Sequence, residues 1–200
     1  MKNALRVIKA NRQYVVMAAI ILMLGTVLGM IFADVFYSLI EDQLEKIQEL
    51  ANQIVGNGNP LYAAWVIFKN NLVAATVLIL SGSFFAIFPI FGLLINGVMI
   101  GVVLNMVSGI SMSTLLVLVV GILPHGILEI PAIIIAGGFG IKLGLVWLFP
   151  DKNISRWQSY LNTWKDTLQI APFIFLLLVG AALIEGVVTP ALMQMFLNTN

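Results

Sequence analysis

Residues 72–107 read LVAATVLILSGSFFAIFPIFGLLINGVMIGVVLNMV, an apolar run of about 36 residues without a charged side chain. A helix needs about 20 residues to cross the hydrocarbon core of a bilayer, so the run is too long for one crossing and long enough for two. Proline and glycine interrupt regular structure, and Pro89 and Gly92 mark the most favourable turn. The run therefore predicts two crossings, at about 72–90 and 93–109.

The composition of the whole chain agrees with a membrane location. Of its 200 residues, 60% are hydrophobic and 10% are charged, which leaves too little polar surface to cover a globular domain. Ten Lys and Arg residues balance nine Asp and Glu residues, and this balance gives no indication of nucleic-acid binding. The chain has no cysteine, which excludes disulfides, thiolate metal sites and cysteine nucleophiles. We predict an all-α, polytopic membrane protein that forms a single membrane domain over residues 1–200.

The first apolar run, at about 14–33, is long enough for one crossing. A signal peptide would have a shorter apolar region followed by a small-residue cleavage site, and neither is evident, so we predict a retained anchor. Lys and Arg favour the cytoplasmic side of a membrane, which makes residues 1–13 a cytoplasmic N terminus. The basic residues of this segment are Lys2, Arg6, Lys9 and Arg12.

Segment 37–71 is expected outside the cytoplasm, and its main element is an amphipathic helix at 39–55. In that helix apolar residues recur at helical spacing and acidic residues occupy other positions. The apolar set is Ile40, Leu44, Ile47, Ala51 and Ile54, and the charged set is Glu41, Asp42, Glu45, Lys46 and Glu49. Residues 56–60 read GNGNP, which predicts the end of the helix. The short apolar stretch 61–68 then leads back to the membrane.

The run at 113–148 could cross the membrane twice, or once with a broken or re-entrant half-helix. One net crossing places Lys152, Arg156 and Lys165 on the cytoplasmic side, as the positive-inside rule favours. Lys142 is then expected to extend to the same surface. We therefore predict about five net crossings, a cytoplasmic interfacial loop at 149–167 and a last span at about 167–193.

Small residues recur at four-residue spacing in several apolar segments, and asparagines accompany them. In lipid such spacing lets helices approach closely, so it predicts tight packing within a bundle or between two copies of the chain. The pairs are Gly25 with Gly29, Gly97 with Gly101, and Gly140 with Gly144. Asn71, Asn96 and Asn105 are expected to donate hydrogen bonds between helices or to lie at the membrane interface.

Between Lys69 and Glu129 the chain carries no Asp, Glu, Lys or Arg. This stretch ends in Pro124-His125-Gly126-Ile127-Leu128-Glu129-Ile130-Pro131, which contains the only histidine of the chain. Each proline lacks an amide proton and disfavours a helical residue before it, so a break in the helix is expected at 124–131. His125 and Glu129 would lie at that break. Ionisable residues inside a membrane are expensive and usually functional, which makes this cluster the candidate site.

Three interpretations of the cluster remain open. His125 and Glu129 could bond to each other and to backbone carbonyls as a structural polar pair, or they could belong to a proton or ion path. They could also bind a divalent metal such as zinc, since imidazole and carboxylate are both zinc ligands. Two ligands are too few, and Glu185 in the last span, or the same pair from a second copy, could complete the site.

The chain resembles the stage II sporulation protein M family over nearly its whole length. The resemblance rests on Phe68-Lys69-Asn70-Asn71, on the region 92–101, and above all on Pro124 to Ala132 running into Ala136-Gly137-Gly138. It implies a helical membrane protein that organises partners. In endospore formers it implies action with a peptidoglycan hydrolase and a second membrane partner during engulfment of the forespore. Similar proteins also occur in bacteria and archaea that do not form spores.

Three function classes follow, of which a scaffold is favoured. No nucleophile, base and oxyanion donor converge in the sequence, so we do not expect an enzyme. A scaffold would hold partners such as the proteins of a cell-wall remodelling complex at 39–55 and at 153–168, and a homodimer is a further alternative. The alternatives are a channel or transporter that uses His125 and Glu129, and a divalent-metal-binding membrane protein.

Overall fold

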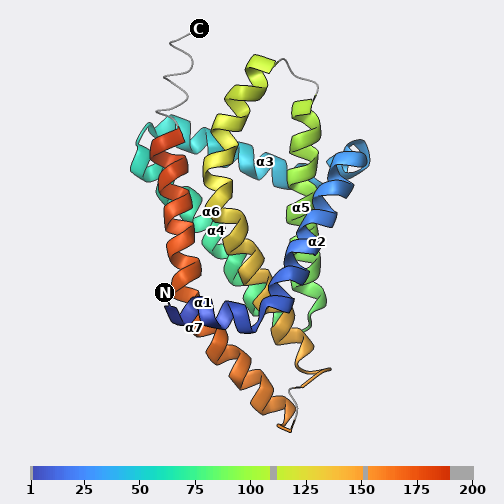
Figure 1. Ribbon diagram of the computed structural model, residues 1–200. Helices are drawn as coiled ribbons and strands as arrows, with labels where there is room; N and C mark the ends of the chain where they lie inside the picture. The colour runs from blue at the N-terminus through green and yellow to red at the C-terminus, as the bar shows by residue number, and fades with distance from the viewer. Residues whose placement is uncertain (1, 109–111, 151–152, 190–200) are drawn as a thin grey trace.

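The computed structural model describes residues 2–108, 112–150 and 153–189, and within these ranges the chain is helical and contains no strand. Figure 1 shows a bundle of long helices with two further helices across its outside. The elements are α1 (Lys2–Ala10), α2 (Arg12–Ile31), α3 (Ala33–Asn57), α4 (Pro60–Gly82), α5 (Ile87–Ser108), α6 (Met112–Leu145), α7 (Arg156–Leu183) and the π-helical turn η1 (Ile184–Val188). The prediction of an all-α protein is confirmed.

Five helices of the described ranges are long and apolar enough to cross a membrane. Consecutive spans run in opposite directions, so the chain passes the bundle five times (Figure 1). The predicted number of crossings and the all-α polytopic class are confirmed. The spans are Arg12–Ile31, Pro60–Gly82, Ile87–Met106, Gly126–Leu145 and Arg156–Val188.

The turn between α4 and α5 lies at residues 83–86, several residues before the predicted position. Pro89 falls in the first turn of α5, where a missing amide proton breaks no helical hydrogen bond. Gly92 continues the same helix and packs against Leu78, whose Cδ2 lies 2.7 Å from where a Cβ would stand. The two residues therefore start and pack the helix and do not make the turn.

Helix α4 begins at Pro60, so the apolar stretch 61–68 is the first part of the span and does not merely lead to it. The Asn59 side chain accepts a hydrogen bond from the amide of Leu61 at 2.9 Å, and Pro60 occupies the first turn. This cap and this proline together favour a helix start here. The preceding helix ends at Asn57, as the GNGNP signal predicts, and Gly58 has a φ of 64°.

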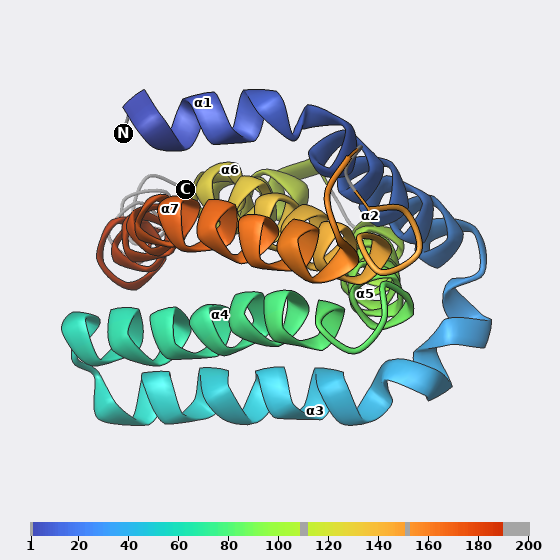
Figure 2. The same ribbon diagram turned by 90° about the horizontal axis from the view of Figure 1, so that it is seen from below.

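The expected break at 124–131 is not an interruption, because α6 is continuous from Met112 to Leu145 through both prolines. A proline removes one hydrogen bond and crowds the preceding turn, and a membrane helix tolerates this when its neighbours cover the freed backbone. Helix α6 has such neighbours, since it packs against α2 and α5 on one side and α4 and α7 on the other. Figure 2 shows it inside this ring of helices.

Glycines let the backbones of α2 and α5 touch, and this pair has the closest association in the bundle. A Cβ on Gly25 would stand 2.5 Å from the carbonyl oxygen of Leu94, and one on Gly29 would collide with the carbonyl of Val98. Gly97 and Gly101 of α5 face α2 in the same way. The predicted tight packing is confirmed, and it occurs within one chain.

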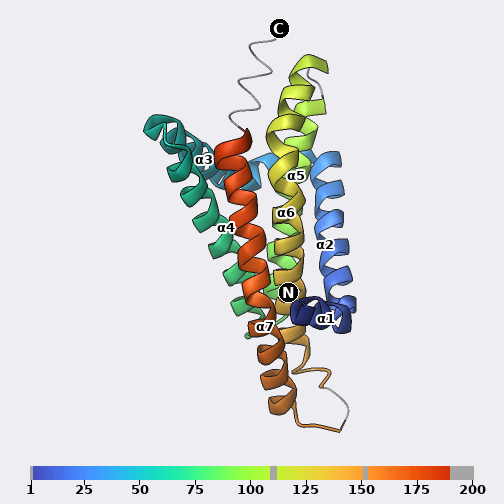
Figure 3. The same cartoon turned by 60° about the vertical axis from the view of Figure 1, so that its left-hand side comes forward.

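The large buried side chains lie mainly on α6 and α7, and they form the core with α2, α4 and α5. They include Phe139, Ile141, Leu143, Ile170 and Leu178. Helix α1 lies across the bundle at one end, and α3 runs across its outside near the other end (Figures 1 and 3). The two helices thus frame the bundle from opposite ends.

Candidate functional site

Glu129 of α6 is half-buried and lines a small cavity between α2, α5 and α6. Asn96 lines the same cavity, and its Nδ2 donates to the carbonyl of Gly92 at 2.8 Å, which leaves the amide oxygen as an acceptor. The other walls are apolar and include Leu22 and Ile133. The cavity volume is about 30 Å³, enough for one or two waters.

The three residues of the predicted metal site are not shown together. His125 belongs to α6, but its side chain lies outside the described part of the structure. Glu185 lies in η1, which packs against α4 through Gly186 and Ala64, and it does not line the Glu129 cavity. Among the described side chains, no group of three or more His, Cys, Asp or Glu could hold a metal ion. The metal site stays a prediction.

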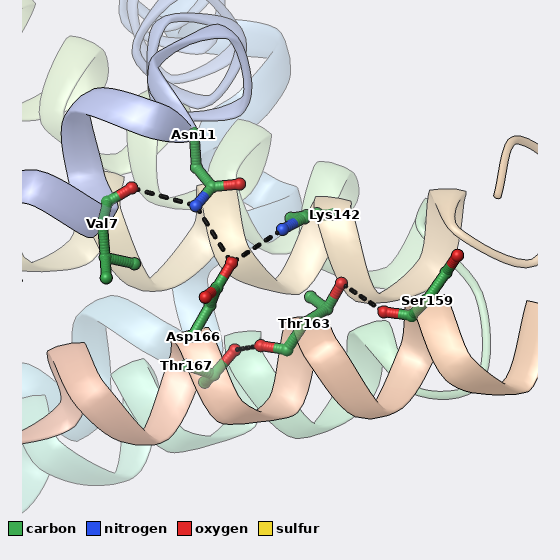
Figure 4. A network of polar contacts seen from close by, with 7 residues as sticks. All are labelled: Val7, Asn11, Lys142, Ser159, Thr163, Asp166 and Thr167. Atoms are coloured by element: carbon green, nitrogen blue, oxygen red, sulfur yellow. Dashed lines mark hydrogen bonds and ion pairs between the residues drawn. The ribbon is translucent and has the colours of Figure 1, made fainter. Parts of the chain in front are cut away.

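A second polar cluster, at the end of the bundle near α1, joins three segments (Figure 4). Lys142 of α6 is only 7% exposed, and its Nζ lies 3.0 Å from Oδ2 of Asp166 on α7. Asn11, between α1 and α2, donates from Nδ2 to the same Oδ2 at 3.2 Å and to the carbonyl of Val7 at 2.9 Å. The expected extension of Lys142 to the membrane surface is therefore wrong, because α7 supplies a carboxylate inside the bundle.

Next to this cluster, buried hydroxyl groups on α7 are satisfied within their own helix (Figure 4). Thr163 donates to the carbonyl of Ser159 at 2.9 Å, and Thr167 donates to the carbonyl of Thr163 at 2.8 Å. Such bonds cover polar atoms where no water is present. The residues therefore serve helix packing, and the ion pair is the charged centre of this region.

The asparagine predictions have a mixed outcome. Asn105 of α5 donates from Nδ2 to the carbonyl of Met30 on α2 at 2.9 Å, so it is an interhelical donor as predicted. Asn96 instead bonds to its own helix and faces the cavity. Asn71 is buried in α4.

Helix α3 carries an exposed charged surface. Its Ile40 is buried in a cluster with Val98 and Val102 of α5, which holds the first half of α3 against the bundle. Four acidic side chains between residues 41 and 49 of the same helix are exposed: Glu41, Asp42, Glu45 and Glu49. We call these four residues the acidic face of α3. It lies outside the five candidate spans.

The sequence reasoning did not find Asp166 and Asn11. Asp166 is the only described carboxylate in a basic region, 24 residues after Lys142 along the chain. An unexplained carboxylate beside basic residues was the available signal. Asn11 gave none, because asparagine before a helix is common and its contact spans 155 residues.

Comparison with known proteins gives one family and two relatives. The family model for stage II sporulation protein M matches residues 18–190. An uncharacterized protein of Methanocaldococcus jannaschii is 27% identical over 158 residues, which are 78% of this chain and 67% of that protein. A second uncharacterized protein of the same archaeon is 29% identical over 127 residues, 62% of this chain and 69% of that protein. No solved structure matches. Since the family model covers four of the five spans in full and residues 18–31 of the first, the chain belongs to the stage II sporulation protein M family.

Proposed function

We propose that this protein is a membrane scaffold that holds a partner protein through the acidic face of α3. The observation that carries the proposal is a 25-residue helix outside the spans, fixed by Ile40 and exposing its carboxylates. Exposed charge on a firmly held helix gives a partner orientation and specificity. The cavity at Glu129 has a volume of only about 30 Å³, which fits a scaffold better than a protein with a wide pore at that residue.

The distribution of charge supports a cytoplasmic N terminus. Most basic residues of the described chain lie at the end that carries α1 and the α6–α7 connection, while the acidic face lies near the other end. Lys and Arg are enriched on the cytoplasmic side. Residues 1–13 and 149–167 are then cytoplasmic, and 37–59 is extracytoplasmic because α4 begins at Pro60. The basic set is Lys2, Arg6, Lys9, Arg12, Lys142, Arg156 and Lys165.

Family membership suggests the class of partner. The resemblance implies a cell-wall hydrolase complex and, in an endospore former, engulfment. An extracytoplasmic α3 would suit such a partner, because cell-wall enzymes act on that side. Two relatives are uncharacterized proteins of an archaeon, so the proposed scaffold role is not tied to spore formation. A homodimer would need a surface other than the glycines of α2 and α5, which pack within the chain.

Reversing charge on the acidic face should release the partner while leaving the bundle intact. In Glu41→Lys with Glu45→Lys we expect at least tenfold less partner recovered with the tagged full-length protein. The attraction between the carboxylates of α3 and basic groups of the partner would become repulsion. Recovery is measured after crosslinking in the producing cells, by quantitative mass spectrometry. A double variant with unchanged recovery contradicts docking at this face.

The control is Arg156→Glu, which reverses an exposed charge at the other end of the bundle and leaves the basic residues of 1–13 in place. It should leave recovery unchanged.

The side of the membrane is checked independently, since the chain has no cysteine of its own. A membrane-impermeant maleimide should label Glu45→Cys and not Lys9→Cys in intact cells, and the reverse pattern contradicts the proposed orientation.

A second candidate function is ion or proton transfer at Glu129, favoured by the oxygen atoms of Glu129 and Asn96 around one small cavity. In liposomes containing the full chain, such transfer predicts a cation or proton flux that Glu129→Gln abolishes. Glu185→Gln, outside that cavity, is the control and should retain the flux. Metal analysis of the same preparations distinguishes a static divalent-metal site, which would give bound metal and no flux.

A further inference from the structure

Helix α4 carries a lysine on its outer face within a candidate span. Lys69 lies nine residues after Pro60, the first residue of the span, and both Lys69 and Asn70 are exposed. At about 1.5 Å per residue this places Lys69 roughly 14 Å along the helix. An ammonium at such a position normally pairs with a carboxylate or lines a polar cavity. No ion pair joins Lys69 to a described carboxylate.

Lys69 does line a cavity, between α3 and α4, with a volume of about 370 Å³. Gln53 of α3 and Tyr62, Trp65 and Asn70 of α4 line it as well, so residues with amide, hydroxyl and indole groups line the same cavity as the ammonium. Lys69 is the one charged side chain among the described lining residues. This combination of a cation and several hydrogen-bond donors suits an anionic group such as phosphate.

A second, apolar groove of about 320 Å³ lies on the other side of α4, where α4 meets α7. Its walls include Leu61, Phe68, Phe175 and Leu183. Trp65 lines both cavities and is 59% exposed, so it forms the ridge between them. Figure 2 shows α4 between α3 and α7, as this arrangement requires.

We propose that α4 binds a single phosphate-bearing amphiphile, with its phosphate at Lys69 and Asn70 and one acyl chain across Trp65 in the groove between α4 and α7. The phosphate supplies a counter-charge that no described carboxylate gives Lys69. The chain covers aromatic and aliphatic surface that would otherwise face mobile lipid. This site is separate from the acidic face of α3 and does not depend on a scaffold role.

The test titrates the purified full-length protein in a neutral detergent with lysophosphatidic acid, and native mass spectrometry counts the bound molecules. We expect one saturable adduct, and at least tenfold weaker binding to Lys69→Gln, which loses a charge-assisted hydrogen bond. Lys69→Arg keeps the charge and should bind within about threefold of the wild type. Lys46→Gln, an exposed lysine of α3, should bind as the wild type.

Two further probes separate the sources of affinity. Monoacylglycerol has the chain without the phosphate, and inorganic phosphate has the anion without the chain, so each should bind at least tenfold more weakly than lysophosphatidic acid. Equal binding of monoacylglycerol would mean that the groove alone recognises lipid and Lys69 only reaches toward the membrane surface. Equal binding of inorganic phosphate would exclude the groove between α4 and α7 as part of the binding site. Either result, or equal binding to Lys69→Gln, overturns the proposal.

Discussion

Replacing Gly97 with alanine is expected to lower the free energy of unfolding by about 3 kcal/mol, at the upper end of the usual cost of overpacking. The added Cβ would collide with the carbonyl of Leu22, and it would lie 2.9 Å from the amide nitrogen of Thr26 and 3.0 Å from the Cα of Gly25. All three are backbone atoms, so no side chain can rotate to make room. Helices α2 and α5 would have to separate. Denaturant unfolding in mild detergent, followed by circular dichroism, measures the loss.

Gly126→Ala is the matched control, because Gly126 also lies in an apolar helix, α6. Among the described side chains, the nearest atom to its added Cβ is Cδ1 of Ile130 at 3.7 Å, an ordinary van der Waals distance. Alanine also has a higher helix propensity than glycine, by up to about 1 kcal/mol. We expect unchanged or slightly higher stability. An equal loss in both variants would mean that flexibility, and not backbone contact, explains these glycines.

The spacing of these glycines predicted close packing, but it could not identify the partner helix. Gly25 and Gly29 could have faced a second copy of the chain as well as α5, since a four-residue spacing describes one helix face and nothing opposite it. The number of spans was more predictable, because each span follows from the length and hydropathy of a local segment. Local patterns therefore indicated the helices, and only the folded chain shows which of them touch.

The errors at α5 and α6 have one physical origin. Proline was interpreted as a turn or a break at both Pro89 and Pro131, yet both lie inside described helices. A proline near a helix start costs nothing, and one inside a bundle is tolerated when neighbours cover its turn. Position in the helix and surroundings decide between these outcomes, and neither can be inferred from the residue itself. The chemistry of His125 and Glu129 depends in the same way on contacts between distant segments.

Removing the carboxylate of Asp166 should destabilise the bundle by about 2–3 kcal/mol. Breaking a fully buried ion pair costs about 3–5 kcal/mol, because one charge remains without a partner. Here the Lys142 side chain is 9% exposed and that of Asp166 is 30% exposed, so solvent screening reduces the cost. Asp166→Ala also removes the α7 acceptor of Asn11, which should loosen α1 from α7. Unfolding in mild detergent measures the first effect, and protease cleavage after Arg6 measures the second.

The double variant Lys142→Met with Asp166→Leu distinguishes two causes of the instability of Asp166→Ala. One is the unpaired ammonium of Lys142, and the other is the lost attraction between the two charges. If the buried ammonium causes the damage, removing both charges should restore at least half of the stability, because apolar side chains of similar size often replace a buried pair without loss. Cleavage after Arg6 should stay faster than in the wild type, since Asn11 still lacks its acceptor on α7. Lys165→Gln changes the exposed neighbour of Asp166 and should alter stability by no more than about 0.5 kcal/mol. A double variant as unstable as Asp166→Ala would show that the attraction between Lys142 and Asp166 holds α6 against α7. The unpaired ammonium would then not be the cause of the instability.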